Sequence, residues 1–385
     1  MDETVTIRNG QVITPTGVVP DGEVVVRGGT IEGVYRTSSR GRASGRSIDA
    51  AGNVVMPGLV DLHGDDIERH LFPRSNATVD PRIAVSTTDR VNLTSGVTTK
   101  FHAIAFEETP EQNRSIDRAR ELANVIGGTD ESLIDNRIHA RCELSAKSVE
   151  AVSDLLEWSA VELVSLMHHA PDSGQFESRD EFVDLYVSER GCTTAEAEQL
   201  LEARSETTAE TLRARCERIV RTARDTATVI ASHDDMSEGS VEWMSDLGVD
   251  IAEYPVTMTA AARAFELGFT TAMGAPNMAR GGSLYGNLSA KRAAEAGVLD
   301  VLCSDYHPPS LLSAAFVDTG ESLSERVARV TRNPADAVGL TDRGRIEEGA
   351  RGDLLVVDPD PVPTVECVLV EGAKLFQTTA SGPAR

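Results

Sequence analysis

The stretch PGLVDLHGD, residues Pro57–Asp65, is an apolar run that ends in a histidine, a glycine and an aspartate. A short apolar run of this kind is typical of a strand that is buried on both faces of a sheet. His63 and Asp65 stand two positions apart, so their side chains point to the same side of such a strand. The stretch therefore predicts a buried strand with a polar site at its end.

Apolar or β-branched runs of the same kind recur along the chain. The eight runs are Pro57–His63, Gly96–Ala103, Arg137–Leu144, Val161–His169, Thr228–Asp234, Val249–Val256, Phe269–Pro276 and Leu299–Asp305. Helix-like segments separate most of them, and alternating strands and helices predict a parallel sheet. Eight such repeats predict an α/β fold in which the sheet closes into a TIM-like (β/α)8 barrel.

The two ends of the chain differ from this middle part, because they are rich in strand-forming residues and turn signals. We expect residues 1–55 and 345–385 to form one small β-sandwich domain from both termini. Residues 56–344 would then form the barrel. The charged stretch 179–224 is longer than a simple crossover needs, and it predicts a helical insertion near the barrel mouth.

Composition limits the protein class. The chain has 385 residues and lacks an apolar run of roughly 18 residues, so no membrane partner is expected. Its five cysteines form no CxxC pair, and its first residues do not resemble a signal peptide, which favours a cytoplasmic protein. The sequence leaves open whether the chain forms a homo-oligomer.

The charge balance is strongly acidic. The formal net charge is −24, and the lysines are Lys100, Lys147, Lys291 and Lys374 alone. So negative a surface makes nucleic acid a poor partner. An acidic, lysine-poor surface also suggests a halophilic protein, since high salt screens its self-repulsion. An ordinary acidic enzyme is the alternative interpretation.

Residues that can bind a metal stand at or near the ends of five of the eight runs. They are His63 and Asp65, Glu143, His168 and His169, His233, and Asp305. The active site of a TIM barrel lies at the carboxyl ends of its strands, so these side chains should converge. Imidazole and carboxylate ligands together suit zinc, manganese or iron. One or two divalent ions are therefore expected, although any single histidine or aspartate here could be structural.

The HxD pair, the later histidines and the final aspartate resemble the amidohydrolase superfamily, whose members also have split β-rich ends. Longer phrases resemble its α-D-ribose 1-methylphosphonate 5-triphosphate diphosphatases, which act in the carbon–phosphorus lyase pathway. These phrases lie at Met56–Arg74, Arg141–Ser145, Ser165–Phe176, Ser232–Asp235, Met273–Asn287 and Ser304–Leu312.

The resemblance implies a ligand set and a reaction. The implied metal ligands are His63, Asp65, Glu143, His169, His233 and Asp305, and Asp305 would also be the general base. His168 competes with His169, and His102 and His307 are further candidates. The implied reaction is hydrolysis of a ribose triphosphate that carries a phosphonate, with release of diphosphate.

A phosphorylated ribose substrate requires positive and hydrogen-bonding groups near the metal. The candidates for contacts with it are Arg74, Lys100, Arg141, Gln175, Asn277 and Arg280. Two other functions compete with this interpretation. A related enzyme would open a cyclic amide or deaminate a base at the same metal site, and a non-catalytic scaffold protein would not need the full ligand set.

Overall fold

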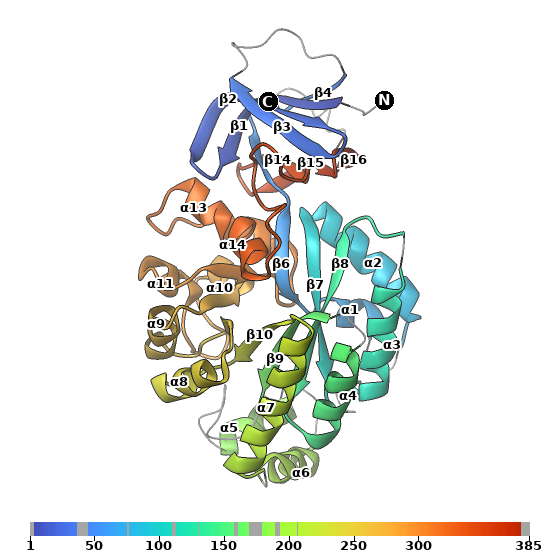
Figure 1. Ribbon diagram of the computed structural model, residues 1–385, viewed down its shortest axis with the longest axis vertical. Helices are drawn as coiled ribbons and strands as arrows, with labels where there is room; N and C mark the ends of the chain where they lie inside the picture. Colours follow the sequence, from blue (N-terminus) through green and yellow to red (C-terminus); the bar gives the residue numbers. More distant parts are fainter. Residues whose placement is uncertain are drawn as a thin grey trace.

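The computed structural model describes residues 4–36, 45–74, 77–109, 113–129, 131–157, 161–168, 179–188, 193–205 and 207–378. Within this part of the chain two sheets dominate, and Figure 1 shows them at different levels along the long axis. No helix among these residues is long and apolar enough to cross a membrane.

The first sheet is the barrel. Its eight strands are β6 (Leu59–Gly64), β7 (Val97–Phe106), β8 (Asp135–Glu143), β9 (Val161–Met167), β10 (Val229–His233), β11 (Ile251–Glu253), β12 (Thr270–Gly274) and β13 (Val301–Cys303). Neighbours in this order pair in parallel. A parallel bridge between Gly64 and Asp305 joins the first strand to the residues after the last, so the sheet nearly closes. All eight predicted runs are confirmed as barrel strands.

Apolar side chains from strands far apart in the sequence, together with Ala335 from a helix, meet in one buried cluster. It consists of Val60, Leu62, Phe101, Leu163, Ala231, Ile251, Ala272, Val301, Cys303 and Ala335. Only the interior of a closed sheet can bring one residue from almost every strand together. The barrel therefore has a packed core, and its polar groups gather at the strand ends.

Helices cover the outside of the barrel. They are α1 (Ile67–Leu71), α2 (Pro81–Thr94), α3 (Ile116–Gly127), α4 (Ala146–Glu157), α7 (Ala209–Asp225), α8 (Glu238–Leu247), α9 (Met258–Glu266), α10 (Ala275–Arg280), α11 (Ala290–Glu295), α12 (Pro309–Ala315), α13 (Leu323–Ala328) and α14 (Arg332–Ala337). Helix α7 illustrates why they form. Thr208 caps its first turn, and Cys216, Ile219, Val220 and Ala223 recur at helical spacing on its buried face.

The stretch predicted as a helical insertion contains α5 (Arg179–Ser188) and α6 (Thr194–Ser205), followed by most of α7. In Figure 1 α5 and α6 lie at the end of the molecule that is farthest from the small sheet. The barrel strand β6 leaves the small sheet through β5, so its carboxyl end, with His63, points away from that sheet.

The second sheet combines both ends of the chain, as predicted. Its strands are β1 (Thr4–Thr14), β2 (Gly17–Arg27), β3 (Thr30–Arg36), β4 (Arg46–Asp49), β5 (Val54–Pro57), β14 (Leu354–Asp358), β15 (Thr364–Val370) and β16 (Ala373–Gln377). They form one mixed sheet in the order β16-β15-β14-β5-β1-β2-β3, and β4 pairs with β1. The N-terminal and C-terminal strands join where β14 pairs antiparallel with β5.

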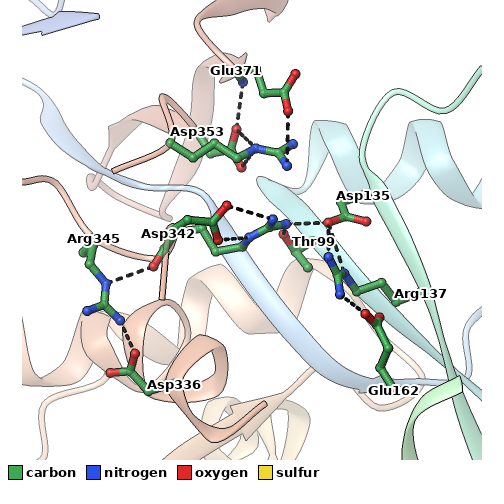
Figure 2. Close-up of polar contacts among 11 residues, drawn as sticks. Thr99, Asp135, Arg137, Glu162, Asp336, Asp342, Arg345, Asp353 and Glu371 are labelled. Carbon is green, nitrogen blue, oxygen red and sulfur yellow. Dashed lines mark hydrogen bonds and ion pairs between the residues drawn. The ribbon is translucent and has the colours of Figure 1, made fainter. Parts of the chain in front are cut away.

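A network of arginines and carboxylates links the residues before β14 to the barrel (Figure 2). Arg343 is buried and donates hydrogen bonds to Thr99 of β7, to Asp135 of β8 and to the neighbouring Asp342. Arg137 continues the network from Asp135 to Glu162. Because Asp135 begins β8 and Thr99 lies near the start of β7, this network fixes the amino-terminal end of the barrel to the C-terminal segment.

Candidate metal centre

Two histidines from different strands meet one glutamate at the carboxyl end of the barrel. His63 Nδ1 lies 3.2 Å from Glu253 Oε1, and His233 Nδ1 lies 3.4 Å from Glu253 Oε2. One ligand atom from each of the three residues lies within 4.8 Å of the others, a spacing at which one metal ion could bind all three. The two imidazole rings are stacked, with centroids 5.6 Å apart.

His139 completes the polar group on the barrel axis. It lies in β8, with its Nε2 3.0 Å from Ser165 Oγ and 3.8 Å from Glu253 Oε2. Its Nδ1 lies 3.0 Å from the carbonyl oxygen of Leu62, which fixes the ring beside His63. Side chains alternate along a strand, so His139 shares its face of β8 with Arg141.

The chain turns sharply directly after three of the strands. Asp234, Tyr254 and Asp305 have φ values of 57°, 53° and 54°, a left-handed conformation that is uncommon for residues other than glycine. These residues follow His233, Glu253 and Ser304, and all three line the cavity that contains His63. The turn after β10 therefore brings the consecutive residues His233 and Asp234 to one cavity, where an extended strand would point them to opposite sides.

The histidines of the cluster are held in their neutral form. Burial lowers the pKa of His63 well below its ordinary value, and it lowers the pKa of His233 to about 3. The positive charge of Arg141 acts in the same direction on both. A neutral imidazole keeps a free lone pair for a metal, and imidazoles with a carboxylate suit a divalent transition metal. The donor set and its protonation state thus fit the implied metal.

Asp65 and Asp305 also line the cavity, beside the cluster. The Asp305 amide donates to the carbonyl oxygen of His63 at 2.8 Å, and the Asp65 amide donates to the carbonyl oxygen of Asp305 at 3.1 Å. Burial and the nearby Asp65 carboxylate raise the pKa of Asp305 above its ordinary value. Such a shift makes the Asp305 carboxylate a stronger proton acceptor than an ordinary aspartate.

Arg141 is the predicted substrate contact that the structure brings closest to this centre. The residue is 8% exposed, lines the cavity, and has its Nη1 3.5 Å from Asp65 Oδ2. Its Nε and Nη1 have no hydrogen-bond partner among the described residues. A buried guanidinium with unused donors is suited to an anionic ligand.

Lys100 lies elsewhere, in the interior beneath the strand ends. Its Nζ is fully buried and contacts Asp61 Oδ2 at 2.6 Å, Asp66 Oδ1 at 2.8 Å and Ser304 Oγ at 3.0 Å. A β-carbon at Gly64 would approach this Nζ to 1.8 Å, so glycine is needed there. Lys100 does not line the cavity, and its contacts hold β6, β7 and the end of β13 together.

Asn277 and Arg280 line the cavity, but their polar groups already have partners. The Asn277 side chain donates to the carbonyl oxygen of Leu288 at 2.9 Å and accepts from the amide of Ala290 at 3.0 Å. Arg280 is exposed and donates to Gly282 and to the Tyr306 hydroxyl. Asn277 therefore fixes the loop on the cavity rim, and Arg280 lies on that rim.

The remaining candidates that the structure describes lie outside the cavity lining. Arg74 is exposed, Glu143 is buried at the end of β8, and His102 is buried with its Nε2 2.8 Å from Asn136 Oδ1. His307 contacts Ser310, and His168 is half-buried after β9. His169 and Gln175 fall outside the described residues, so their predicted roles stay predictions.

The structure adds two residues that the sequence analysis did not select, Glu253 and His139. Glu253 stands at the end of β11, just as the selected residues stand at the ends of their own runs. A carboxylate in an otherwise apolar run indicates a site residue, so the sequence could have identified it. His139 lies in the middle of β8, where no rule about strand ends would find it.

Comparisons with known proteins show the family of this chain. Histidine and carboxylate groups at the carboxyl end of a barrel are typical of metal-dependent hydrolases. A model of the amidohydrolase family matches residues 192–373. The chain is 33% identical over 359 residues to the alpha-D-ribose 1-methylphosphonate 5-triphosphate diphosphatase of Escherichia coli strain K12, covering 91% of this chain and 94% of that protein. The chain belongs to the amidohydrolase family.

Solved structures agree with the fold. A D-hydantoinase from Bacillus sp. AR9 has a TM-score of 0.64 at 13% identity, covering 97% of this chain and 95% of that one. A beta-aspartyl dipeptidase from Fervidobacterium islandicum has a TM-score of 0.62 at 15% identity, covering 97% of each chain. At these identities the likeness concerns the fold alone.

Proposed function

We propose that this chain is a metal-dependent diphosphatase of phosphonate catabolism. It would hydrolyse α-D-ribose 1-methylphosphonate 5-triphosphate to the 5-phosphate and diphosphate. The observation that carries the proposal is the 33% identity to the Escherichia coli diphosphatase, which extends over 91% of this chain. The alternative is a cyclic-amide hydrolase or deaminase, which would share the barrel and the metal ligands.

The cavity supports an anionic substrate. It has a volume of about 300 Å³ and is lined by Arg114, Arg141 and Arg280 together with His63 and His233 of the metal cluster. Arg114 forms ion pairs with Glu68 and Glu107, and Arg280 lies on the rim of the cavity. Arg141 is left as the buried cation with free donors, 3.5 Å from Asp65. We therefore assign it the closest contact with the phosphoryl groups.

The polar residues of the site would each have a role in this hydrolysis. His63, His233 and Glu253 would hold a divalent ion, and such an ion would lower the pKa of a nearby water molecule. In the proposed hydrolysis a water oxygen forms a bond to the phosphorus nearest the ribose, and the bond from that phosphorus to the diphosphate oxygen breaks. Asp305 accepts the proton of the water, and Arg141 offsets the charge on the phosphoryl oxygens.

Zinc, manganese and iron all suit these ligands, and one or two ions could bind. Asp65, Glu143 and His169 stay predicted ligands next to the three clustered residues. Cytoplasmic location and halophilic origin also stay predictions, because they depend on composition alone.

A comparison of three substrates tests the function. The purified protein, supplied with zinc, manganese or iron, is offered the phosphonate triphosphate, a nucleoside triphosphate and a cyclic amide. We expect diphosphate from the phosphonate triphosphate, measured by phosphorus NMR, and no new carboxylate from the amide. Opening of the amide with both triphosphates intact would instead identify a cyclic-amide hydrolase.

Replacement of Arg141 by methionine tests the anionic site. This change removes the buried positive charge and keeps most of the side-chain volume. A hydrogen bond to a charged group contributes about 1.5–3 kcal/mol, so we expect kcat/KM for the triphosphate to fall roughly 10- to 150-fold. The metal content should stay unchanged.

Arg82→Met is the matched control, because Arg82 is exposed and pairs with Asp80 outside the cavity. We expect this control to retain the kinetic constants of the unmodified protein. Equal kinetic constants for Arg141→Met and the control would remove Arg141 from the substrate site.

A further inference from the structure

Tyr254 is a cavity residue that neither the proposed ligand set nor the proposed proton transfer uses. It follows β11 directly, has a φ of 53°, and lines the same cavity as His63 and His233. A left-handed conformation is costly for a bulky side chain, and such strain is concentrated at functional sites. The conformation is held by the Tyr254 amide, which donates to the carbonyl oxygen of Ala272 at 2.8 Å.

The ring of Tyr254 is fixed against both histidines of the cluster. Its centroid lies 5.0 Å from that of His63 and 5.2 Å from that of His233, with an edge-on arrangement in each case. Aromatic pairs prefer this geometry, so the two contacts hold the ring in one orientation. The position of the hydroxyl group is therefore set by the same residues that would hold the metal.

The hydroxyl group itself is buried and has no hydrogen-bond partner among the described residues. Native proteins rarely leave a buried hydroxyl without a partner, because the lost hydration is not replaced. An unused donor at a cavity wall is therefore best explained by a ligand atom that accepts its hydrogen bond.

We propose that the Tyr254 hydroxyl donates a hydrogen bond to a non-bridging oxygen of the phosphoryl group under attack. This inference rests on the proposed function and adds a catalytic residue to it. Negative charge builds up on the phosphoryl oxygens as the water oxygen approaches phosphorus, and a fixed donor stabilises that charge more than it stabilises the bound substrate. Arg141 contributes positive charge, and Tyr254 contributes one directed hydrogen bond from the β11 side.

Replacement of Tyr254 by phenylalanine isolates the hydroxyl, because the ring and its contacts with both histidines are kept. Removing one donor to a developing oxyanion typically lowers kcat by about 100- to 1000-fold. We expect a loss of roughly 100-fold in kcat for the triphosphate, with little change in KM. Metal content should match that of the unmodified protein, and the melting temperature should not fall, since no hydrogen bond is lost. Tyr35→Phe, in β3 of the small sheet, is the matched control and should change none of these quantities.

Binding of orthovanadate provides a measurement that does not depend on turnover. Vanadate adopts five-coordinate geometry like that of phosphorus under attack, so Tyr254→Phe should bind it at least 10-fold more weakly. Inorganic diphosphate, which lacks that geometry, should bind both proteins equally. A kcat within threefold of the control, or unchanged vanadate binding, would overturn the role of Tyr254.

The two proposals fail in different ways. An unmodified protein that leaves every triphosphate intact overturns the proposed function, and vanadate binding then still decides whether Tyr254 contacts a phosphoryl-like group. An active unmodified protein with an equally active Tyr254→Phe variant overturns the inference alone.

Discussion

Glu253→Gln is expected to abolish both metal binding and hydrolysis. The carboxylate lies 3.2 Å from His63 and 3.4 Å from His233, and glutamine keeps its shape but removes the negative charge that a cation requires. Without the ion no water of lowered pKa forms, so we expect turnover to fall at least about 1000-fold. The measurement is metal content by elemental analysis together with diphosphate release.

His233→Ala should have the same effect, because it removes a second atom of the cluster. Glu143→Gln is the informative comparison, since Glu143 was a predicted ligand but is not one of the three clustered residues. We expect this variant to retain its metal. If Glu143→Gln lost its metal and Glu253→Gln kept it, the metal ligand would be Glu143 and not Glu253.

Asp305→Asn is expected to keep most of the metal and to lose turnover. An amide cannot accept the proton of the attacking water, and loss of a general base costs about 100- to 10,000-fold in rate. Asparagine tolerates the left-handed φ of 54° at this position, so the turn after β13 should survive. The hydrogen bonds that Asp305 forms with His63 and Asp65 are made by its backbone and are also kept.

The control for this prediction is Asp21→Asn. Asp21 also has a positive φ, of 49°, but it lies in β2 of the small sheet. Its variant should retain full turnover. If Asp305→Asn turned over the triphosphate at the rate of this control, the proton acceptor would lie elsewhere in the cavity.

The barrel and the position of its site could be predicted because they depend on local patterns. Each strand is an apolar run, and parallel strands bring their carboxyl ends to one edge, which is why His63, His233 and Asp305 line one cavity. The same rule would have selected Glu253, had the carboxylate in that run been given the weight of the others.

The partners of the positive and amide groups could not be predicted. Lys100 was expected to contact substrate. Its ammonium group instead forms ion pairs with Asp66 and with Asp61, which lies 39 positions away in the sequence. The Asn277 side chain similarly forms hydrogen bonds with the backbone of Leu288 and Ala290. A sequence gives the type of such a side chain, but whether its donors are already used depends on contacts that only folding creates.

The sheet that combines both termini has a consequence for the order of events during synthesis. Strands β1 to β5 leave the ribosome first, but β5 obtains its partner β14 only after the whole barrel has been made. Until then Val54–Pro57 present an unpaired apolar edge, and unpaired edges invite association with other chains. A nascent chain stalled before residue 354 would carry every clustered metal ligand and still lack the strands that protect this edge.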